Sequence, residues 1–168
     1  MKRFFSLALA AALLIASLCA CGSGSEGGKD QQVDLAAFAQ TVQTNHSFPN
    51  LDRLDPADEE FGATMLENAY PGLKDMDLAQ VEIYVAMISF SGGELALVQT
   101  KSADDAAKVK EIFDARIASK TTEGPGNYPE EVEMWQHSST VVSNGNYVML
   151  VNSEDSAAVV SEFNDLFK

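Results

Sequence analysis

The stretch that decides the fold is VEIYVAMISFSGGELALVQT, residues 81–100. Both halves are rich in β-branched and apolar residues, and Ser91-Gly92-Gly93 separates them. Two such runs joined by a Gly-Gly turn predict a β-hairpin. The apolar residues that follow over 103–120 recur at helical spacing, so one face of a helix must cover this hairpin. These residues are Ala106, Val109, Ile112, Phe113 and Ile117.

The last third of the chain repeats this plan. Strands are predicted over 140–142 and 147–151, with a turn between them and a helix over 156–167. Gly93 aligns with Gly145 and Leu97 with Met149, which gives two ββα units. We expect an α+β fold in which N-terminal helices precede a four-stranded antiparallel sheet, with helices on one face. Any hairpin followed by a helix would look duplicated, so a true duplication stays open.

Two helices are predicted before the first hairpin. Asp34 can cap a helix over 33–44, and acidic residues favour the start of a helix over 57–68. The acidic run preceding and opening the second helix could also bind calcium, although its spacing departs from the EF-hand loop. This run consists of Asp52, Asp55, Asp58, Glu59 and Glu60. Helix caps explain the same residues, so no metal site is predicted.

The amino-terminal sequence predicts the location of the protein in the cell. Lys2 and Arg3 precede a long apolar run that ends in Leu18-Cys19-Ala20-Cys21, which resembles a bacterial lipobox. We expect residues 1–20 to be a signal peptide, 21–32 a flexible Gly/Ser linker and 33–168 one domain. Acylated Cys21 would then anchor the protein in the lipid bilayer, on the extracytoplasmic face of the cell membrane. The alternative is an ordinary signal peptide with a free cysteine.

Charge and cysteine content exclude several classes of function. The chain has 11 Lys and Arg against 25 Asp and Glu, and loss of Lys2 and Arg3 with the leader changes its formal net charge from −14 to −16. Nucleic-acid binding needs clusters of basic residues, which this chain lacks. Cys19 and Cys21 are its only cysteines, so the domain has no disulfide, zinc-thiolate site or cysteine nucleophile.

No catalytic or cofactor motif is recognisable in the domain. His46 and His137 have no second ligand at metal-binding spacing. Ser91-Gly92-Gly93 lacks the full nucleophile elbow, and a hairpin turn explains it. We therefore predict no catalytic residue and no cofactor.

The segment 124–135 is the candidate ligand- or partner-binding site. It combines a Gly-Pro-Gly turn with Tyr128, Trp135 and several carboxylates, and Tyr70 lies in a segment of similar character. Arg116 could pair with a carboxylate of this segment, such as Glu130 or Glu131. The alternative is a connection whose aromatic side chains close the core.

Two functions follow from these residues. The first is a non-catalytic module of the cell envelope that binds a ligand, a peptide or another envelope protein. The second is a cell-wall or peptide hydrolase in which carboxylates near Glu130–Glu133 act as acid and base. A catalytic pair needs environments that push the two pKa values apart, and the sequence gives no sign of this.

A family resemblance extends from about residue 35 to residue 167. The chain resembles the domain-of-unknown-function family 4358 of Gram-positive bacterial lipoproteins. The resemblance implies the surface of a cell with a single membrane, and it implies no activity and no site residue. Its motifs are Asn68-Ala69-Tyr70-Pro71-Gly72-Leu73, Ser91-Gly92-Gly93-Glu94, Ala115-Arg116-Ile117, Tyr128-Pro129-Glu130 and Asn144-Gly145-Asn146-Tyr147-Val148.

Overall fold

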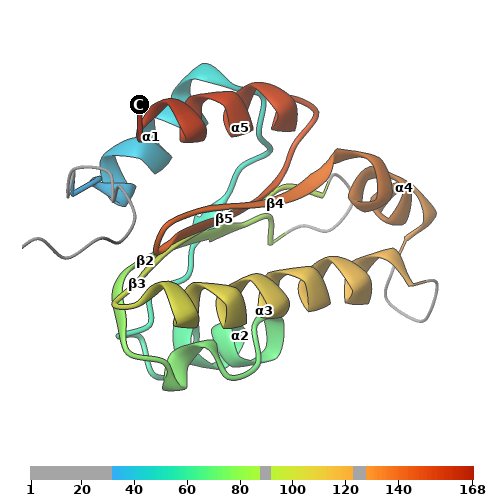
Figure 1. The fold of residues 1–168 in the computed structure, drawn as a ribbon. Helices are drawn as coiled ribbons and strands as arrows, with labels where there is room; N and C mark the ends of the chain where they lie inside the picture. The colour runs from blue at the N-terminus through green and yellow to red at the C-terminus, as the bar shows by residue number, and fades with distance from the viewer. Residues whose placement is uncertain (1–31, 88–91, 123–127) are drawn as a thin grey trace, which may run out of the picture.

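A five-stranded antiparallel sheet forms the centre of the protein, in the strand order β1-β2-β3-β5-β4 (Figure 1). The structure, a computed structural model, describes residues 32–87, 92–122 and 128–168. The α+β class is confirmed, and β1 adds a short fifth strand to the predicted four. The elements are α1 (Leu35–Asn45), β1 (Asp52–Arg53), α2 (Gly62–Ala69), the 3-10 helix η1 (Leu73–Asp75), β2 (Leu78–Val85), β3 (Glu94–Thr100), α3 (Ala103–Thr121), α4 (Pro129–Ser138), β4 (Ser139–Asn144), β5 (Tyr147–Asn152) and α5 (Ser156–Asp165).

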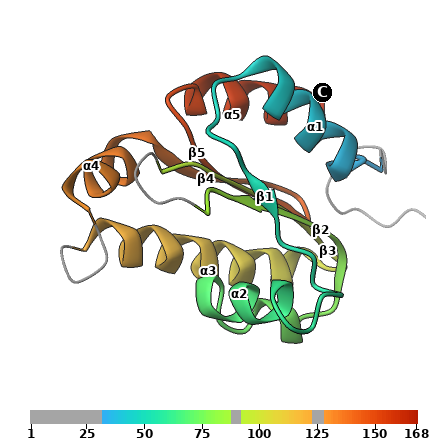
Figure 2. The same cartoon turned by 180° about the vertical axis from the view of Figure 1, so that it is seen from behind.

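Helices cover both faces of the sheet, so the prediction that they lie on one face is wrong. Figures 1 and 2 show α2 and α3 on one side of the sheet and α1 and α5 on the other. The cause lies in the central strands. In β3, Leu95 and Leu97 belong to the core under α1 and α5, whereas Ala96 and Val98 belong to the core under α2 and α3. A strand that is apolar on both faces needs a helical layer on each.

The two ββα units do not superpose in three dimensions. Leu97 and Met149 are cross-strand partners and lie in the same core. A two-fold rotation that exchanged β3 and β5, which run antiparallel, would leave both following helices on the same face. Instead α3 and α5 lie on opposite faces (Figure 1). The repeated plan in the sequence is therefore a repeat of element order and not of arrangement.

Side-chain caps fix where the helices begin. Asp34 accepts a hydrogen bond from the backbone N–H of Ala37 at 3.0 Å, as its predicted capping role requires. The helix predicted over 57–68 begins later, at Gly62, because Asp58 accepts hydrogen bonds from the N–H groups of Glu60 and Phe61. These bonds hold the acidic residues in a turn ahead of α2.

Val33, near the start of the described residues, is held by the sheet through both its backbone N–H and its carbonyl group. Its N–H donates to Tyr147 Oη at 3.2 Å, and its carbonyl accepts from Gln80 Nε2 at 2.8 Å. The Gln80 side chain also accepts from the N–H of Leu35 at 3.1 Å. Residues of β2 and β5 thus fix the point at which the chain enters α1.

The predicted leader, Cys21 and the linker up to residue 31 lie outside the described residues, as do residues 88–91 and 123–127. Within the part of the chain that the structure describes, no helix has the length and apolar character needed to cross a bilayer.

Candidate functional site

An ion pair is buried between the sheet and α3. Glu94 is the first residue of β3, and Arg116 lies on α3 facing it. Arg116 Nε donates to Glu94 Oε1 at 3.0 Å, and one Nη donates to Glu94 Oε2 at 2.7 Å. The Glu94 side chain is only 2% exposed and that of Arg116 16%. This two-point geometry is the strongest that a carboxylate and a guanidinium can adopt.

Aromatic rings surround this ion pair. Tyr70 is fully buried and its hydroxyl donates to Glu94 Oε1. The Arg116 guanidinium carbon lies 5.7 Å from the centre of the Tyr70 ring and 5.5 Å from that of Trp135. The guanidinium therefore has cation–π contacts with two rings as well as its carboxylate partner.

The same surroundings shift two pKa values. Burial, and then the adjacent Glu94 carboxylate, raise the pKa of the Tyr70 hydroxyl well above its ordinary value. Burial acts to lower the pKa of Arg116, but the charge and hydrogen bonds of Glu94 outweigh it, so the net shift is upward. Tyr70 thus stays neutral and Arg116 stays charged.

Helix α4 brings Trp135 to the cluster. No helix was predicted in the candidate binding segment, and the structure forms one from Pro129 onward. The signal was present: proline favours the first helical position, and Glu130 and Glu131 follow it in the first turn. Glu131 turns inward, where its Oε1 accepts from Lys120 Nζ of α3 at 2.8 Å. This bond ties α4 to α3.

A row of polar side chains continues from Glu94 across the sheet. Glu94 is opposite Asn152 of β5, and Asn152 is opposite Ser139 of β4. Within the described residues, both polar atoms of the Asn152 side chain and the Ser139 hydroxyl are buried without a hydrogen-bond partner. Trp135 Nε1 and Glu131 Oε2 share this condition. Buried polar groups of this kind commonly bind ordered water.

The structure brings together three of the five predicted site residues. Tyr70, Arg116 and Trp135 meet, but Tyr70 and Trp135 fill the interior and line no open groove. Tyr128 is 46% exposed and Glu130 is also at the surface. Arg116 binds Glu94 in place of the hypothesised Glu130 or Glu131.

Glu94 itself was missed as a site residue. The available signal was a carboxylate directly ahead of the apolar run Leu95–Val98. A charge buried with such a strand requires a partner. The acidic run between Asp52 and Glu60, considered as a calcium site, forms no such buried cluster. Among the described residues no three His, Cys, Asp or Glu side chains are placed to hold a metal ion.

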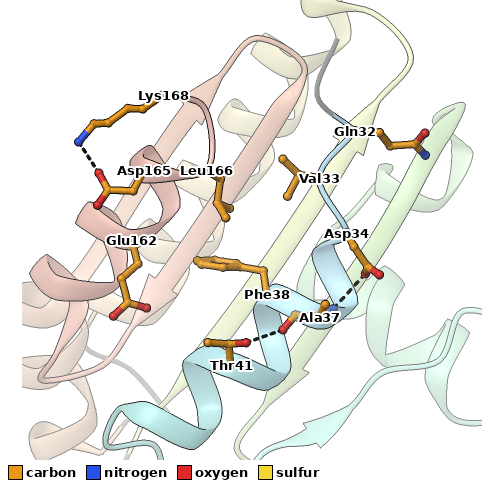
Figure 3. A pocket seen from close by; sticks show the side chains of 10 residues that line it. All are labelled: Gln32, Val33, Asp34, Ala37, Phe38, Thr41, Glu162, Asp165, Leu166 and Lys168. Atoms are coloured by element: carbon orange, nitrogen blue, oxygen red, sulfur yellow. Dashed lines mark hydrogen bonds and ion pairs between the residues drawn. The ribbon is translucent and has the colours of Figure 1, made fainter. Parts of the chain in front are cut away.

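A surface groove lies between α1 and α5 (Figure 3). Val33, Phe38 and Leu166 supply its apolar surface, and Phe38 points into the space between the two helices. Three carboxylates line the same groove, namely those of Asp34, Glu162 and Asp165. Gln32, Ala37, Thr41 and Lys168 complete the lining.

The groove carboxylates have partners within the domain. Glu162 Oε1 is 2.9 Å from His46 Nε2, and Asp165 pairs with Lys168. Asp34 caps α1. The groove thus combines an apolar surface with an acidic lining that is fixed in position.

The fold and the buried cluster define an α+β protein built around an internal Tyr–Glu–Arg network. The family described as "Domain of unknown function (DUF4358)" matches residues 54–153, and the chain belongs to this family. The match contains the whole buried cluster, whereas α1, α5 and the groove between them lie outside it. The comparison with curated proteins found no match, and the comparison with solved structures found none either.

Proposed function

We propose that this protein is a lipid-anchored domain on the extracytoplasmic face of the cell membrane, where it binds a protein segment and catalyses no reaction. The groove between α1 and α5 is the single observation that supports binding. It is a concave surface that both apolar and charged side chains line (Figure 3).

The chemistry of the groove favours a cationic amphipathic segment of another envelope protein. Val33, Phe38 and Leu166 suit the apolar side of such a segment, and the carboxylates suit its Lys or Arg side chains. The formal net charge of −16 expected after loss of the leader would also attract a basic partner over a distance.

The lipobox-like ending at Cys21 supports the proposed anchor. The residues between Cys21 and Val33 are mostly Gly, Ser and polar side chains, which suit a tether. Gln32 lines the groove, so a tether that ends just ahead of Val33 would enter the domain beside it. A segment bound there would be held close to the membrane.

The geometry does not support the alternative of a hydrolase using Glu130–Glu133. Glu131 is buried and paired with Lys120, whereas Glu130 and Glu133 are exposed on the outer side of α4. An acid–base pair must face one substrate from a shared cleft. These carboxylates face different environments and share no described cleft.

Binding can be tested by NMR titration with a helical Lys/Leu peptide as the probe. We expect shift changes confined to α1 and α5, and affinity that falls as salt screens the charges. Ala37→Arg should weaken binding, since it places a bulky cation in the groove. Ala107→Arg adds the same charge on the exposed side of α3 and serves as the matched control. Chemical-shift changes spread over both faces of the sheet, or an equal loss of affinity in the two variants, would refute binding in the groove.

The anchor can be tested separately in cells grown with labelled palmitate. The wild-type chain and Cys19→Ala should carry the label in the membrane fraction, whereas Cys21→Ala should not. Label retained by Cys21→Ala, or an unmodified amino terminus found by mass spectrometry, would exclude the proposed anchor.

A further inference from the structure

Strand β4 has an open edge. Among the described residues it is the last strand of the sheet and pairs only with β5. The N–H of Ser153 donates to the carbonyl of Ser138, so Ser138 is hydrogen-bonded to the neighbouring strand. Every second residue after it therefore also directs its backbone groups toward β5. The N–H and C=O groups of Ser139, Val141 and Ser143 therefore point away from β5. None of them has a backbone partner among the residues that the structure describes.

Nothing in the sequence of β4 protects this edge. Natural sheets guard open edges with charged residues, prolines or bulges. Residues 138–152 contain no Asp, Glu, Lys, Arg or Pro, and the pairing of β4 with β5 runs without a bulge. The opposite edge differs, since β1 is two residues long and Arg53 pairs there with Glu82 at 2.8 Å. One edge is guarded by charge and the other is not.

We infer that the open edge of β4 pairs antiparallel with β4 of a second copy of this chain. Centred on Val141, the pairing would satisfy the outward backbone groups of Ser139, Val141 and Ser143 in both copies. The sequence Ser139-Thr140-Val141-Val142-Ser143 reads almost the same in both directions. Serine therefore lies opposite serine and valine opposite valine. The two β-branched residues Thr140 and Val142 also face each other, which suits a strand pair.

Charge decides in favour of a second copy. Two molecules that each carry a large negative charge can approach only where neither presents carboxylates, and β4 with its turn and β5 is such a neutral stretch. A basic partner strand would find no carboxylate on β4 to pair with. Added salt should therefore strengthen the self-association, because it screens the repulsion between the copies. This dependence is opposite to that expected for peptide binding in the groove, so the two proposals succeed or fail independently.

Register-specific disulfides give the sharpest test. The chain from Gly22 onward contains every described residue and no cysteine, so single cysteines can be introduced. Val141→Cys should form a disulfide-linked dimer, because each Val141 is opposite its own copy. Thr140→Cys and Val142→Cys should cross-link when mixed and not when alone, since each is opposite the other and both side chains are partly exposed. Ala107→Cys, on the exposed side of α3, controls for random collision. Equal cross-linking of all four variants, or none in Val141→Cys and the mixture, would overturn the inference.

Sedimentation velocity supplies the equilibrium measurement. Ser143→Pro removes an outward N–H and leaves the β4–β5 ladder intact, because edge strands accept proline at such positions. We expect an unchanged melting temperature and a dimerisation constant about tenfold weaker or more. A wild-type chain that stays monomeric at high salt, or a dimer that Ser143→Pro leaves unchanged, would contradict the pairing.

Discussion

Arg116 binds Glu94 with two parallel hydrogen bonds of 3.0 and 2.7 Å beside the buried rings of Tyr70 and Trp135. Glu94 begins β3 and Arg116 lies in the second half of α3, so the pair joins helix to sheet. Charges in such a setting are stable only together, because either alone would be a buried unpaired ion.

Replacing Glu94 by glutamine should lower the free energy of unfolding by about 3–5 kcal/mol, since it leaves the buried guanidinium without a compensating charge. Chemical denaturation measures this change. Adding Arg116→Met to Glu94→Gln should recover part of the loss, because both charges are then gone. Asp114→Asn breaks the exposed pair with Lys110 and should cost less than about 1 kcal/mol. Equal loss in the single and double variants would show that the charges are not coupled.

Tyr70 should make stability depend on pH in the alkaline range. Its folded pKa is raised by burial and by Glu94, so above the ordinary tyrosine pKa of 10.0 the unfolded chain releases this proton and the folded chain keeps it. The folded state then binds more protons, and stability falls as pH rises above that value, by up to about 1.4 kcal/mol per pH unit. Above pH 10.0, the free energy of unfolding obtained from denaturation curves should fall less steeply with pH for Tyr70→Phe than for the wild type. Tyr84→Phe, which removes a half-buried hydroxyl, should keep most of the dependence.

Gly93 should not tolerate a side chain. Its φ of +122° is a conformation that other residues rarely adopt, and a Cβ there would lie 2.4 Å from Pro49 Cγ. Gly93→Ala should therefore destabilise the domain by at least about 1–3 kcal/mol in thermal or chemical unfolding. Gly145→Asn is the control, because Gly145 has open space around it and asparagine accepts its φ of +57°. A similar effect at both positions would show that the contact with Pro49 is unimportant.

Trp135 should report on the core. It is the single tryptophan of the chain and its side chain is almost fully buried. Its fluorescence should be blue-shifted and poorly quenched by acrylamide, and Trp135→Ala should cost about 3–5 kcal/mol in chemical denaturation. Phe61→Ala removes a large ring that is 46% exposed and should cost far less. Ready quenching of the folded protein would contradict the packing of α4 on the core.

The elements could be predicted from the sequence because their signals are local. The strands of both hairpins and the helix over 103–120 are marked by composition, glycine turns and periodicity, and all of them form, although β2 begins and ends earlier than the run that predicted it. The helical layers could not be placed because local periodicity does not say on which side of the sheet a helix packs. The unbroken apolar character of Leu95–Val98 was the available clue that both sides are covered.

The buried cluster was predicted only in part for a similar reason. Aromatic character singled out Tyr70 and Trp135, and a charge on the helix singled out Arg116. The ion pair of Arg116 with Glu94 joins residues that are 22 positions apart in the sequence. No spacing rule predicts a contact between a strand and a helix at that separation. Helix α4 was missed because the glycines and proline ahead of it dominate the composition of that segment.

The hold on Val33 has a mechanical consequence. If the protein is tethered at its amino terminus, a force applied from the membrane acts on the domain first at this residue. Tyr147 and Gln80 there form hydrogen bonds with its backbone N–H and C=O groups. These bonds attach the tether to strands on both sides of β3, so the load spreads into the middle of the sheet before it reaches α1. Single-molecule stretching from the amino terminus should therefore meet its main resistance at the first step.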